Sequence, residues 1–488
     1  MLHTDNITIL QKPVRLSIIG KYLGQLLIVL AYLTLIPLAA SLYFMEYNFT
    51  VRYAITEIIL LIAGLPLSRI NATANIQNNE GLVITGLIFI LTPLIMTIPM
   101  MGSGLDFIDA LFEAVSAFTT TGLSVATELQ LQPLTFLFAR SYMQWIGGLG
   151  IVVLTIALLL RPGIYLRKLV ELNENEDIVS STLPYARRIF MVYVLLTVIC
   201  IVMIWIACGN FFNAVTHAFS AVSTGGFSNF DNSLAGFDSP FVSISVILGC
   251  VFGALPLLLY FRIRRYPFWA FFQDAQVRAI TYFVLFTSIL LFIVLVHDSH
   301  IKATEALYHA LMMAISAQTT AGFSTIDISL IGAHGMLILM IAMFVGGSLG
   351  STAGGVKLYR ILIFWRTLHH MLQKATTTPH AVIAPRLAGK NLEIDEISKA
   401  LLVILLFFFT IIFSWLVFLF AGHEPIAALF EVVSATGTVG LSSGITSVDL
   451  PYYLKLILCL CMLLGRLEFI AFLVLAYPLT WVNRRSRA

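Results

Sequence analysis

The chain has 488 residues, of which 59% are hydrophobic and 11% charged, and its formal net charge is +3. Soluble globular proteins carry about a quarter charged residues, so this composition excludes a large soluble protein with a buried apolar core. The nearly balanced charge gives no indication of a nucleic-acid partner. Apolar runs repeatedly reach the ~20 residues that cross ~30 Å of hydrocarbon, which predicts a multi-pass helical membrane protein embedded in a lipid bilayer.

Hydropathy divides the chain into long and short apolar segments. The first two long runs, at 17–45 and 51–68, form an N-terminal helix pair. Eight more runs are expected to cross the membrane, at 82–101, 133–160, 185–208, 239–262, 275–297, 333–368, 397–421 and 451–482. Four shorter segments fit re-entrant half-helices better than crossings because they are too short to span. They lie at 107–118, 211–222, 304–318 and 425–435.

Basic residues lie at alternate ends of these runs and orient the chain. They precede the first helix, follow the second, fourth, sixth and eighth helices, and close the chain: Lys12, Arg15, Lys21, Arg69, Arg161, Arg167, Lys168, Arg262, Arg264, Arg265, Lys357, Arg360, Arg366, Arg484, Arg485 and Arg487. Because loops rich in Lys and Arg stay in the cytoplasm, both termini are predicted inside. The four short segments then open to the outside.

An internal repeat coincides with the four short segments. The chain has ALFEAVSAFTTTGLS from 110, AVTHAFSAVSTGGFS from 214, ALMMAISAQTTAGFS from 310 and ALFEVVSATGTVGLS from 428. All four share Ala, then Ser-Ala six positions on, then Thr, any residue, Gly, Leu or Phe, and Ser. Helix packing in membranes favours small residues at spacing four, but it does not produce a common fifteen-residue register.

The predicted fold class is therefore an all-α polytopic membrane protein. Four tandem helix–half-helix–loop–helix units surround a pseudo-fourfold pore, and two extra transmembrane helices precede them. We expect the N-terminal helix pair at 1–72 and pore units 1 to 4 at 73–170, 171–267, 268–372 and 373–488.

The loop after each half-helix has the residues of a cation filter. Irregular backbone at membrane depth is tolerated only where it is buried in protein or lines a water-filled cavity, and carbonyls around an axis can replace an ion's hydration shell. Each loop offers a glycine, which permits unusual backbone angles, and a threonine hydroxyl, and it lacks a carboxylate. These neutral oxygens favour a weakly hydrated monovalent ion. The expected K⁺ filter is Thr119, Thr120, Thr121, Gly122, Ser223, Thr224, Gly225, Gly226, Thr319, Thr320, Ala321, Gly322, Gly437, Thr438, Val439 and Gly440.

These loops resemble the four filter loops of the Trk/Ktr/HKT superfamily of potassium transporters, and the resemblance covers nearly the whole chain. The extra N-terminal pair resembles the TrkH and TrkG membrane subunits rather than KtrB. The resemblance implies K⁺ uptake across a bacterial inner membrane, a homodimer and a cytosolic TrkA-like nucleotide-binding regulatory subunit. Gly122 stands where serine accompanies Na⁺ in some plant members, which implies K⁺ preference. The loops depart from the TVGYG signature of potassium channels, so we expect weaker ion discrimination.

Two features predict a gate below the filter. The run 346–357 contains five glycines in twelve residues, and each glycine costs a helix about 1 kcal/mol against alanine; a tight packing site or a simple kink is the alternative. Arg466 lies in the middle of the last span, where a charge is costly and usually functional. A pore-facing role is favoured over a structural pair because Glu468 lies off its face. The superfamily resemblance implies the same gating loop and arginine. The expected gate residues are Gly346, Gly347, Ser348, Gly350, Gly354, Gly355, Lys357 and Arg466.

Four acidic residues lie near the half-helices. Glu113 and Glu431 occupy matching repeat positions, where they are expected to anchor the half-helices by hydrogen bonding. Asp106 and Asp109 are expected near the outer mouth, either attracting cations or forming a solvated rim.

Three alternative functions remain open at this point. The first is H⁺- or Na⁺-coupled cation symport. The second is a secondary transporter that binds a solute between rocking repeats. The third is a hydrolase, since Gly346 to Gly350 matches G-x-S-x-G, although the elbow requires a strand–turn–helix context. The chain has no P-loop and no dinucleotide fingerprint in its proper context, so no organic cofactor is expected and nucleotide control is assigned to another chain.

Overall fold

The computed structural model describes residues 13–72, 76–159, 182–237, 239–263, 272–297, 301–378, 384–387 and 390–481. Some of the basic residues used for orientation lie outside these ranges: Lys12, Arg161, Arg167, Lys168, Arg264, Arg265, Arg484, Arg485 and Arg487. The expected unit boundaries at 170/171 and 267/268 lie outside them as well.

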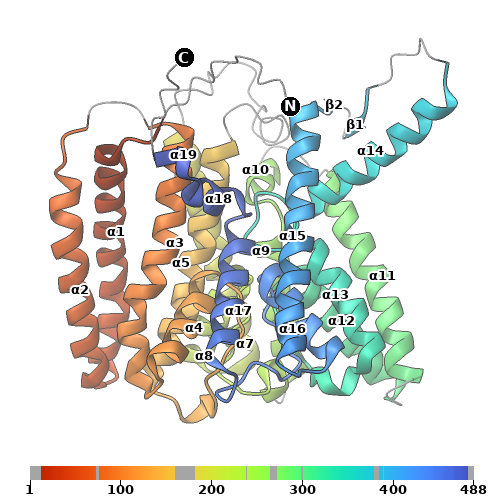
Figure 1. Ribbon diagram of the computed structural model, residues 1–488. Helices are drawn as coiled ribbons and strands as arrows, with labels where there is room; N and C mark the ends of the chain where they lie inside the picture. Colours follow the sequence, from red (N-terminus) through yellow and green to blue (C-terminus); the bar gives the residue numbers. More distant parts are fainter. Residues whose placement is uncertain are drawn as a thin grey trace, which may run out of the picture.

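The described chain is a bundle of helices (Figure 1). The N-terminal pair is α1 (Leu16–Tyr43) and α2 (Tyr47–Ser68). Units 1 and 2 comprise α3 (Asn78–Met100), α4 (Phe107–Phe118), α5 (Leu134–Leu159), α7 (Thr182–Cys208), α8 (Phe211–Val222) and α9 (Pro240–Ala254), followed by the short α10 (Tyr260–Ile263). Unit 3 comprises α11 (Ala275–His297), α12 (Ala303–Gln318), α13 (Gly332–Val345) and α14 (Leu358–Thr376), so the expected boundary at 372/373 falls inside α14. Strands β1 (Arg386–Leu387) and β2 (Lys390–Asn391) form one antiparallel pair. Unit 4 comprises α15 (Ile394–Phe420), α16 (Pro425–Gly437), α17 (Tyr452–Arg466), α18 (Ile470–Ala476) and the short α19 (Pro478–Trp481).

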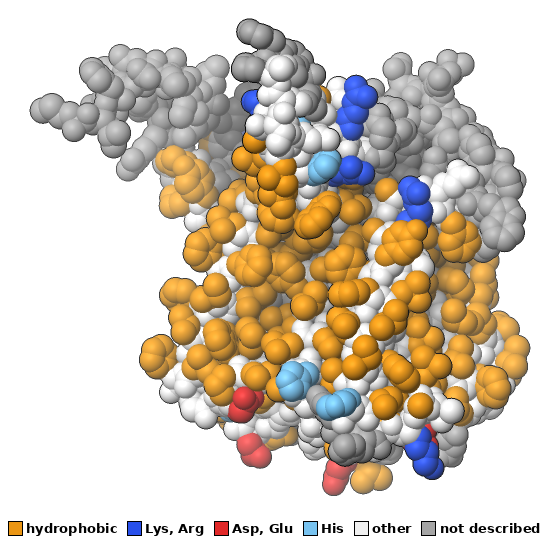
Figure 2. All heavy atoms as spheres, turned by 90° about the vertical axis from the view of Figure 1, so that its right-hand side faces the viewer, with side chains coloured by type: hydrophobic (Ala, Val, Ile, Leu, Met, Phe, Trp, Pro, Cys, Tyr) orange, Lys and Arg blue, Asp and Glu red, His pale blue; other side chains and the backbone are white. Residues whose placement is uncertain are grey.

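Most of the expected membrane spans are present. Within the described residues, seven helices are long and apolar enough to cross a membrane, and the bent pair α17–α18 makes an eighth. The two other expected spans are α5 and the shorter α9. Figure 2 shows one face as a broad hydrophobic belt, with Lys and Arg mainly at the end near α14 and Asp and Glu at the opposite end. This distribution suits a chain whose outer surface contacts lipid.

Two spans that were predicted to be continuous are broken. In the run 239–262 the first helix ends at Ala254, because Pro256 forces Leu255 into an extended conformation, and the short α10 follows. The run 451–482 breaks after Arg466, and the next helix leaves at 111°. The run 333–368 is interrupted at 346–357, as the glycine-rich sequence predicts.

The half-helices and their neighbours form a closed ring. Each half-helix packs between the two long helices of its own unit and also against the second long helix of the preceding unit. Thus α8 contacts α5, α12 contacts α9, α16 contacts α13, and α4 contacts α17, which closes the cycle. The four units therefore surround one axis, in the pseudo-fourfold arrangement that the repeat predicts.

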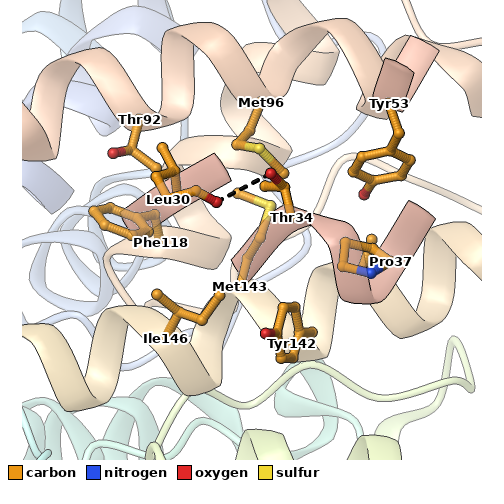
Figure 3. A pocket seen from close by; sticks show the side chains of 11 residues that line it. Leu30, Thr34, Pro37, Tyr53, Thr92, Met96, Phe118, Tyr142, Met143 and Ile146 are labelled. Atoms are coloured by element: carbon orange, nitrogen blue, oxygen red, sulfur yellow. Dashed lines mark hydrogen bonds between the residues drawn. The ribbon is translucent and has the colours of Figure 1, made fainter. Parts of the chain in front are cut away.

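The N-terminal pair packs on the outside of unit 1. Helices α1 and α2 pack against each other and against α3, and α1 also contacts α5. A small internal cavity lies between these helices, with Thr34 of α1, Tyr53 of α2 and Tyr142 of α5 in its wall (Figure 3). The Thr34 hydroxyl donates to Leu30 O at 3.0 Å and to the buried Glu57 at 2.7 Å, which joins the two helices by a polar contact inside the membrane.

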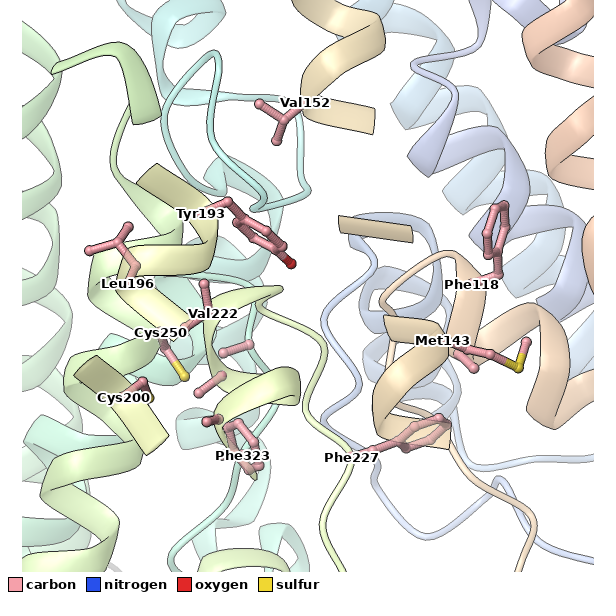
Figure 4. Close-up of a cluster of buried hydrophobic side chains, with 14 of the residues drawn as sticks. Phe118, Met143, Val152, Tyr193, Leu196, Cys200, Val222, Phe227, Cys250 and Phe323 are labelled. Carbon is pink, nitrogen blue, oxygen red and sulfur yellow. The ribbon is translucent and has the colours of Figure 1, made fainter. Parts of the chain in front are cut away.

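The largest buried cluster surrounds the filter region. It runs from Phe118 and Met143 in unit 1, through Tyr193 and Val222 in unit 2, to Phe323 just after the third filter glycine (Figure 4). Close packing of this kind holds irregular loops in one conformation.

Candidate ion filter and gate

The same backbone hydrogen bonds start all four loops. The N–H groups of Thr121, Gly225, Ala321 and Val439 donate to the carbonyls of the repeated serines at 2.7–2.9 Å. The preceding threonine N–H groups donate to the carbonyls of the repeated alanines. The Ser-Ala pair of the repeat therefore closes each half-helix. Because these loop N–H groups point back into their half-helices, the loop carbonyls are left for other partners.

Each loop carries two left-handed residues. Thr120, Thr224, Thr320 and Thr438 have φ between 50° and 54°. The glycines two positions later, Gly122, Gly226, Gly322 and Gly440, have φ between 75° and 95°. A β-branched residue in this region is a genuine outlier that costs of order 1–3 kcal/mol and persists where the surroundings enforce it. Four repetitions of the same strain show that the loops share one imposed conformation.

The four glycines bring the loops into direct contact with one another. A Cβ at Gly122 would lie 2.2 Å from Gly225 O, and one at Gly226 would lie 2.2 Å from Ala321 O. A Cβ at Gly322 would lie 1.9 Å from Val439 O, and one at Gly440 would lie 2.1 Å from Thr121 O. Each loop thus touches the next, and the fourth touches the first. No side chain fits at these positions without displacing a filter carbonyl.

All four filter glycines line one cavity of about 520 Å³ on the side of the loops away from the gate segment. Asp231 and Asp327 also line this cavity, here called the vestibule, and both are exposed. They lie five residues after the second and third filter glycines, a signal that the sequence contains and that the repeat analysis did not use. Neither Asp106 nor Asp109 is among the residues that line the vestibule. The expectation for Asp109 is wrong, whereas Asp106 is exposed, as the solvated-rim alternative expects. Asp109 is buried and paired with Lys455 of α17, and Asp106 is 3.4 Å from the Tyr452 hydroxyl.

Buried carboxylates fasten the first and fourth loops to their half-helices. Glu113 Oε1 accepts from Ser124 Oγ at 2.7 Å and from Val125 N at 2.8 Å. Glu431 accepts from the hydroxyls of Ser442 and Ser443, each at 2.9 Å. The anchoring expected of these two residues is confirmed. In each case the bond reaches eleven or twelve residues ahead and holds the chain that leaves the filter.

The anchor of the first loop includes a cation that the sequence analysis missed. Arg140 of α5 has its Nε 3.0 Å from Glu113 Oε2, and both side chains are buried. Neither of these two atoms makes a hydrogen bond within the described chain, so the contact is an ion pair and not a straight hydrogen bond. The guanidinium also lies 3.9 Å from the centre of the Phe227 ring. Glu431 has no such cation among the described residues.

The other two loops have weaker anchors at the same repeat position. His217 Nε2 lies 3.0 Å from Ser228 Oγ, and Thr325 N donates to the Met313 sulfur at 3.4 Å. Gln144 of α5 adds a contact to the second loop, donating to Gly225 O at 2.5 Å. The four filter loops therefore share a backbone conformation but differ in what holds them.

The segment 346–357 lies directly beneath the filter and is buried throughout. Gly354 N donates to Thr320 Oγ1 at 2.6 Å, and Gly355 N donates to Gly437 O at 2.9 Å. Gly346 and Gly355 have left-handed φ values of 68° and 74°, and Gly350 has 77°. Unwound backbone in contact with two filter loops fits the barrier that was predicted from the glycines.

Charged residues hold this segment from the side of the last helix. Arg466 Nη1 donates to Thr352 O at 2.8 Å, so the arginine contacts the gate segment itself. Glu468 pairs with Arg360 of α14, and Lys357 donates to Ala353 O. Glu468 is therefore not the partner of Arg466, as its off-face position predicts. Ser348 is buried and its hydroxyl has no hydrogen-bond partner within the described chain, which gives the hydrolase alternative no base at this serine.

Comparisons with known proteins agree over nearly the whole chain. A family model described as "TrkH: Cation transport protein" matches residues 46–480. The chain is 32% identical to the Trk system potassium uptake protein TrkH of Halomonas elongata, over 96% of this chain and 99% of that one. It is 28% identical to an uncharacterised cation transporter of Methanocaldococcus jannaschii, over 93% of this chain and 94% of that one. The crystal structure of the potassium transporter TrkH from Vibrio parahaemolyticus matches with a TM-score of 0.85 and 26% identity, over 96% of this chain and 100% of that chain.

Proposed function

The chain belongs to the TrkH family of cation transport proteins, and we propose that it takes up potassium ions across a bacterial inner membrane. The observation that carries the proposal is the closed ring of four loops, in which each filter glycine touches a carbonyl of the next loop. Neutral backbone and hydroxyl oxygens around one axis are the ligands with which a protein replaces the water shell of K⁺. The names of the relatives in the Trk system support the choice of ion.

The distribution of basic residues supports ion entry from the filter side of the molecule. The basic residues that lie in the described chain near the gate, Lys357 and Arg360, are on the opposite side of the loops from the vestibule. By the positive-inside rule the gate side is cytoplasmic, and so are both termini. Ions then pass from the vestibule through the four loops and past 346–357. The membrane potential drives this movement with about 2.3 kcal/mol per charge per 100 mV.

Two partners are part of the proposal. The chain forms a homodimer and binds a cytosolic TrkA-like nucleotide-binding subunit that controls the gate. Support comes from α14, which continues directly from the gate segment and projects from the bundle at the cytoplasmic end (Figure 1). Its exposed apolar side chains include Trp365 (67% exposed), Met371 (65%) and Leu372 (60%). A helix of this kind is suited to a protein contact that transmits force to the gate.

The test is Rb⁺ and Na⁺ uptake by a strain that lacks its own K⁺ uptake systems. Wild-type chain restores Rb⁺ uptake, and Gly122→Ser loses discrimination against Na⁺ because its side chain meets Gly225 O at 2.2 Å. Gly104→Ser is the matched control, since Gly104 has a similar φ of 88° but has open space around it. Failure of the wild type to transport Rb⁺ refutes the proposal. A requirement for a Na⁺ or H⁺ gradient in addition to the membrane potential identifies symport.

A further inference from the structure

The gate segment uses the hydroxyl groups of the filter itself. Besides the bond from Gly354 N to Thr320 Oγ1 at 2.6 Å, a Cβ at Gly354 would lie 2.1 Å from Thr438 Oγ1. Thr352 Oγ1 lies 3.4 Å from Thr224 Oγ1 in the second loop. Three of the four equivalent threonines are thus in contact with 346–357.

The same ring of threonines contains buried hydroxyls without a partner. The hydroxyls of Thr120 and Thr438 make no hydrogen bond within the described chain, although the two residues are 0% and 1% exposed. A buried hydroxyl left unpaired costs about 1–3 kcal/mol. The Thr224 hydroxyl donates to Ser223 O at 2.7 Å, so Thr120 and Thr438 are the two equivalent positions whose free hydroxyls indicate a ligand. The hard, neutral hydroxyl oxygen suits a monovalent cation.

We propose that the four filter threonines form an inner cation site, and that a bound cation and the closed gate segment compete for it. The proposal rests on the proposed function and adds that the transported ion itself helps to open the gate. In the structure the gate segment occupies part of this site. Thr320 Oγ1 accepts a hydrogen bond from Gly354 N, and the backbone of Gly354 fills the space beside Thr438.

A cation and the gate segment exclude each other from the site for electrostatic and for steric reasons. An N–H that donates to Thr320 Oγ1 presents its positive end where a cation would need the oxygen's negative charge. The Gly354 backbone is also in direct contact with Gly437 O, since a Cβ there would lie only 2.3 Å away. A dehydrated ion that uses these oxygens must displace Gly354. Conversely, a closed segment leaves the ion with Thr120 as its one uncontacted hydroxyl among the four.

Amide hydrogen exchange of the purified full chain in detergent tests this competition without relying on transport. Exchange in peptides covering 346–357 is compared in KCl and in choline chloride at equal ionic strength. We expect faster exchange in KCl, because K⁺ displaces the segment and choline does not fit the site. Equal exchange in the two salts overturns the proposal, and this comparison requires no variant.

Two variants separate the gate contact from the ion contact. Thr320→Val removes the acceptor of Gly354 N, so exchange in choline rises about fivefold, the shift expected from one neutral hydrogen bond. Thr120→Val is the matched control, because Thr120 has nearly the same φ and burial but no partner in the gate segment. It leaves exchange in choline low and weakens the response to K⁺. Exchange that rises equally in both variants refutes the assignment of Thr320.

Rb⁺ uptake by the wild type keeps the two proposals apart. Uptake without a K⁺ effect on exchange leaves the proposed function standing and removes the competition. Absence of uptake removes the proposed function itself.

Discussion

The buried pair of Glu113 and Arg140 allows a direct test of how the first filter loop is held. Both side chains are almost fully buried, at 0% and 1% exposure, and their charged atoms are 3.0 Å apart. Glu113→Gln keeps the shape of the side chain but removes the anion that contacts the buried Arg140 and leaves it only Asp231, which lines the same vestibule. Removing one member of a buried pair in this way costs about 3–5 kcal/mol.

The fourth loop supplies the comparison. Glu431 makes the same bonds to the chain beyond its filter but has no cation beside it among the described residues. Both carboxylate oxygens of Glu431 accept from backbone N–H groups, so the amide NH2 of Glu431→Gln loses one of these bonds, at a cost of about 1.5–3 kcal/mol, but leaves no buried cation unpaired. We expect Glu113→Gln to lower the free energy of unfolding more than Glu431→Gln. The double variant Glu113→Gln/Arg140→Met should be less damaged than the sum of its two single variants.

Unfolding in mixed micelles titrated with a denaturing detergent measures these differences, and Rb⁺ uptake against Na⁺ reports the shape of the loop. Glu113→Gln should also reduce Rb⁺ over Na⁺ discrimination, since an uncharged amide oxygen accepts more weakly from Ser124 and Val125 than the carboxylate does. The reasoning fails if Glu113→Gln is no more harmful than Glu431→Gln. It fails equally if the effects of the Glu113 and Arg140 substitutions simply add, because additivity means that the two groups do not interact.

Three further results are expected from uptake assays. Gly440→Ala abolishes K⁺ discrimination while Gly444→Ala keeps it, because both positions have left-handed φ values (95° and 92°) but only the first meets a carbonyl; equal loss would assign the effect to backbone strain. Arg466→Ala raises Rb⁺ flux in the absence of a regulatory subunit, since it releases the gate segment, and an unchanged flux would contradict this. Asp231→Asn combined with Asp327→Asn slows uptake at low ionic strength, and the difference disappears in high salt, which screens exposed charges.

The ring of filter loops could be predicted because its causes are local and repeated. The left-handed glycine and the Ser-Ala cap of each loop are required by the backbone geometry of one fifteen-residue segment. They therefore recur at the same positions in all four copies of the sequence. Four copies of one local structure can bury their loops only by meeting one another. The residue contacts between loops, such as Gly322 against Val439 O, then follow from the arrangement.

Features that depend on contacts between distant segments were not predictable from the repeat. Arg140 lies on α5, outside the repeated fifteen residues, so nothing in the sequence connects it with Glu113. The pairing of Asp109 with Lys455 joins residues 346 positions apart, and without it Asp109 is indistinguishable from a residue at the mouth. Such pairs are set by how the units face each other, which a sequence pattern within one unit does not describe.

The breaks in the second helices show how one repeated contact led to different outcomes. Gly147, Gly253 and Gly465 pass so close to the residue before the filter that a Cβ would lie 1.9–2.2 Å from its carbonyl. Gly346 takes this place in unit 3, where its carbonyl accepts from Gln318. The helix continues through Gly147, ends one residue after Gly253 and Gly465, and ends at Val345, just before Gly346. The glycine therefore allows the second helix to pass close to the end of the half-helix. The residues next to the glycine decide whether the second helix breaks there.

In unit 4 the break is maintained by contacts with the gate side of unit 3. Glu468 and Phe469 both have left-handed φ values, 51° and 64°, which costs of order 1–3 kcal/mol for each residue. The cost is offset because Glu468 pairs with Arg360 and because Phe469, 2% exposed, packs its ring 4.9 Å from that of Phe407. Arg360 lies in the first turn of α14, the helix that leaves the gate segment. A movement of that helix therefore removes the support of the strained turn, so the gate segment and the break beside Arg466 are expected to change conformation together.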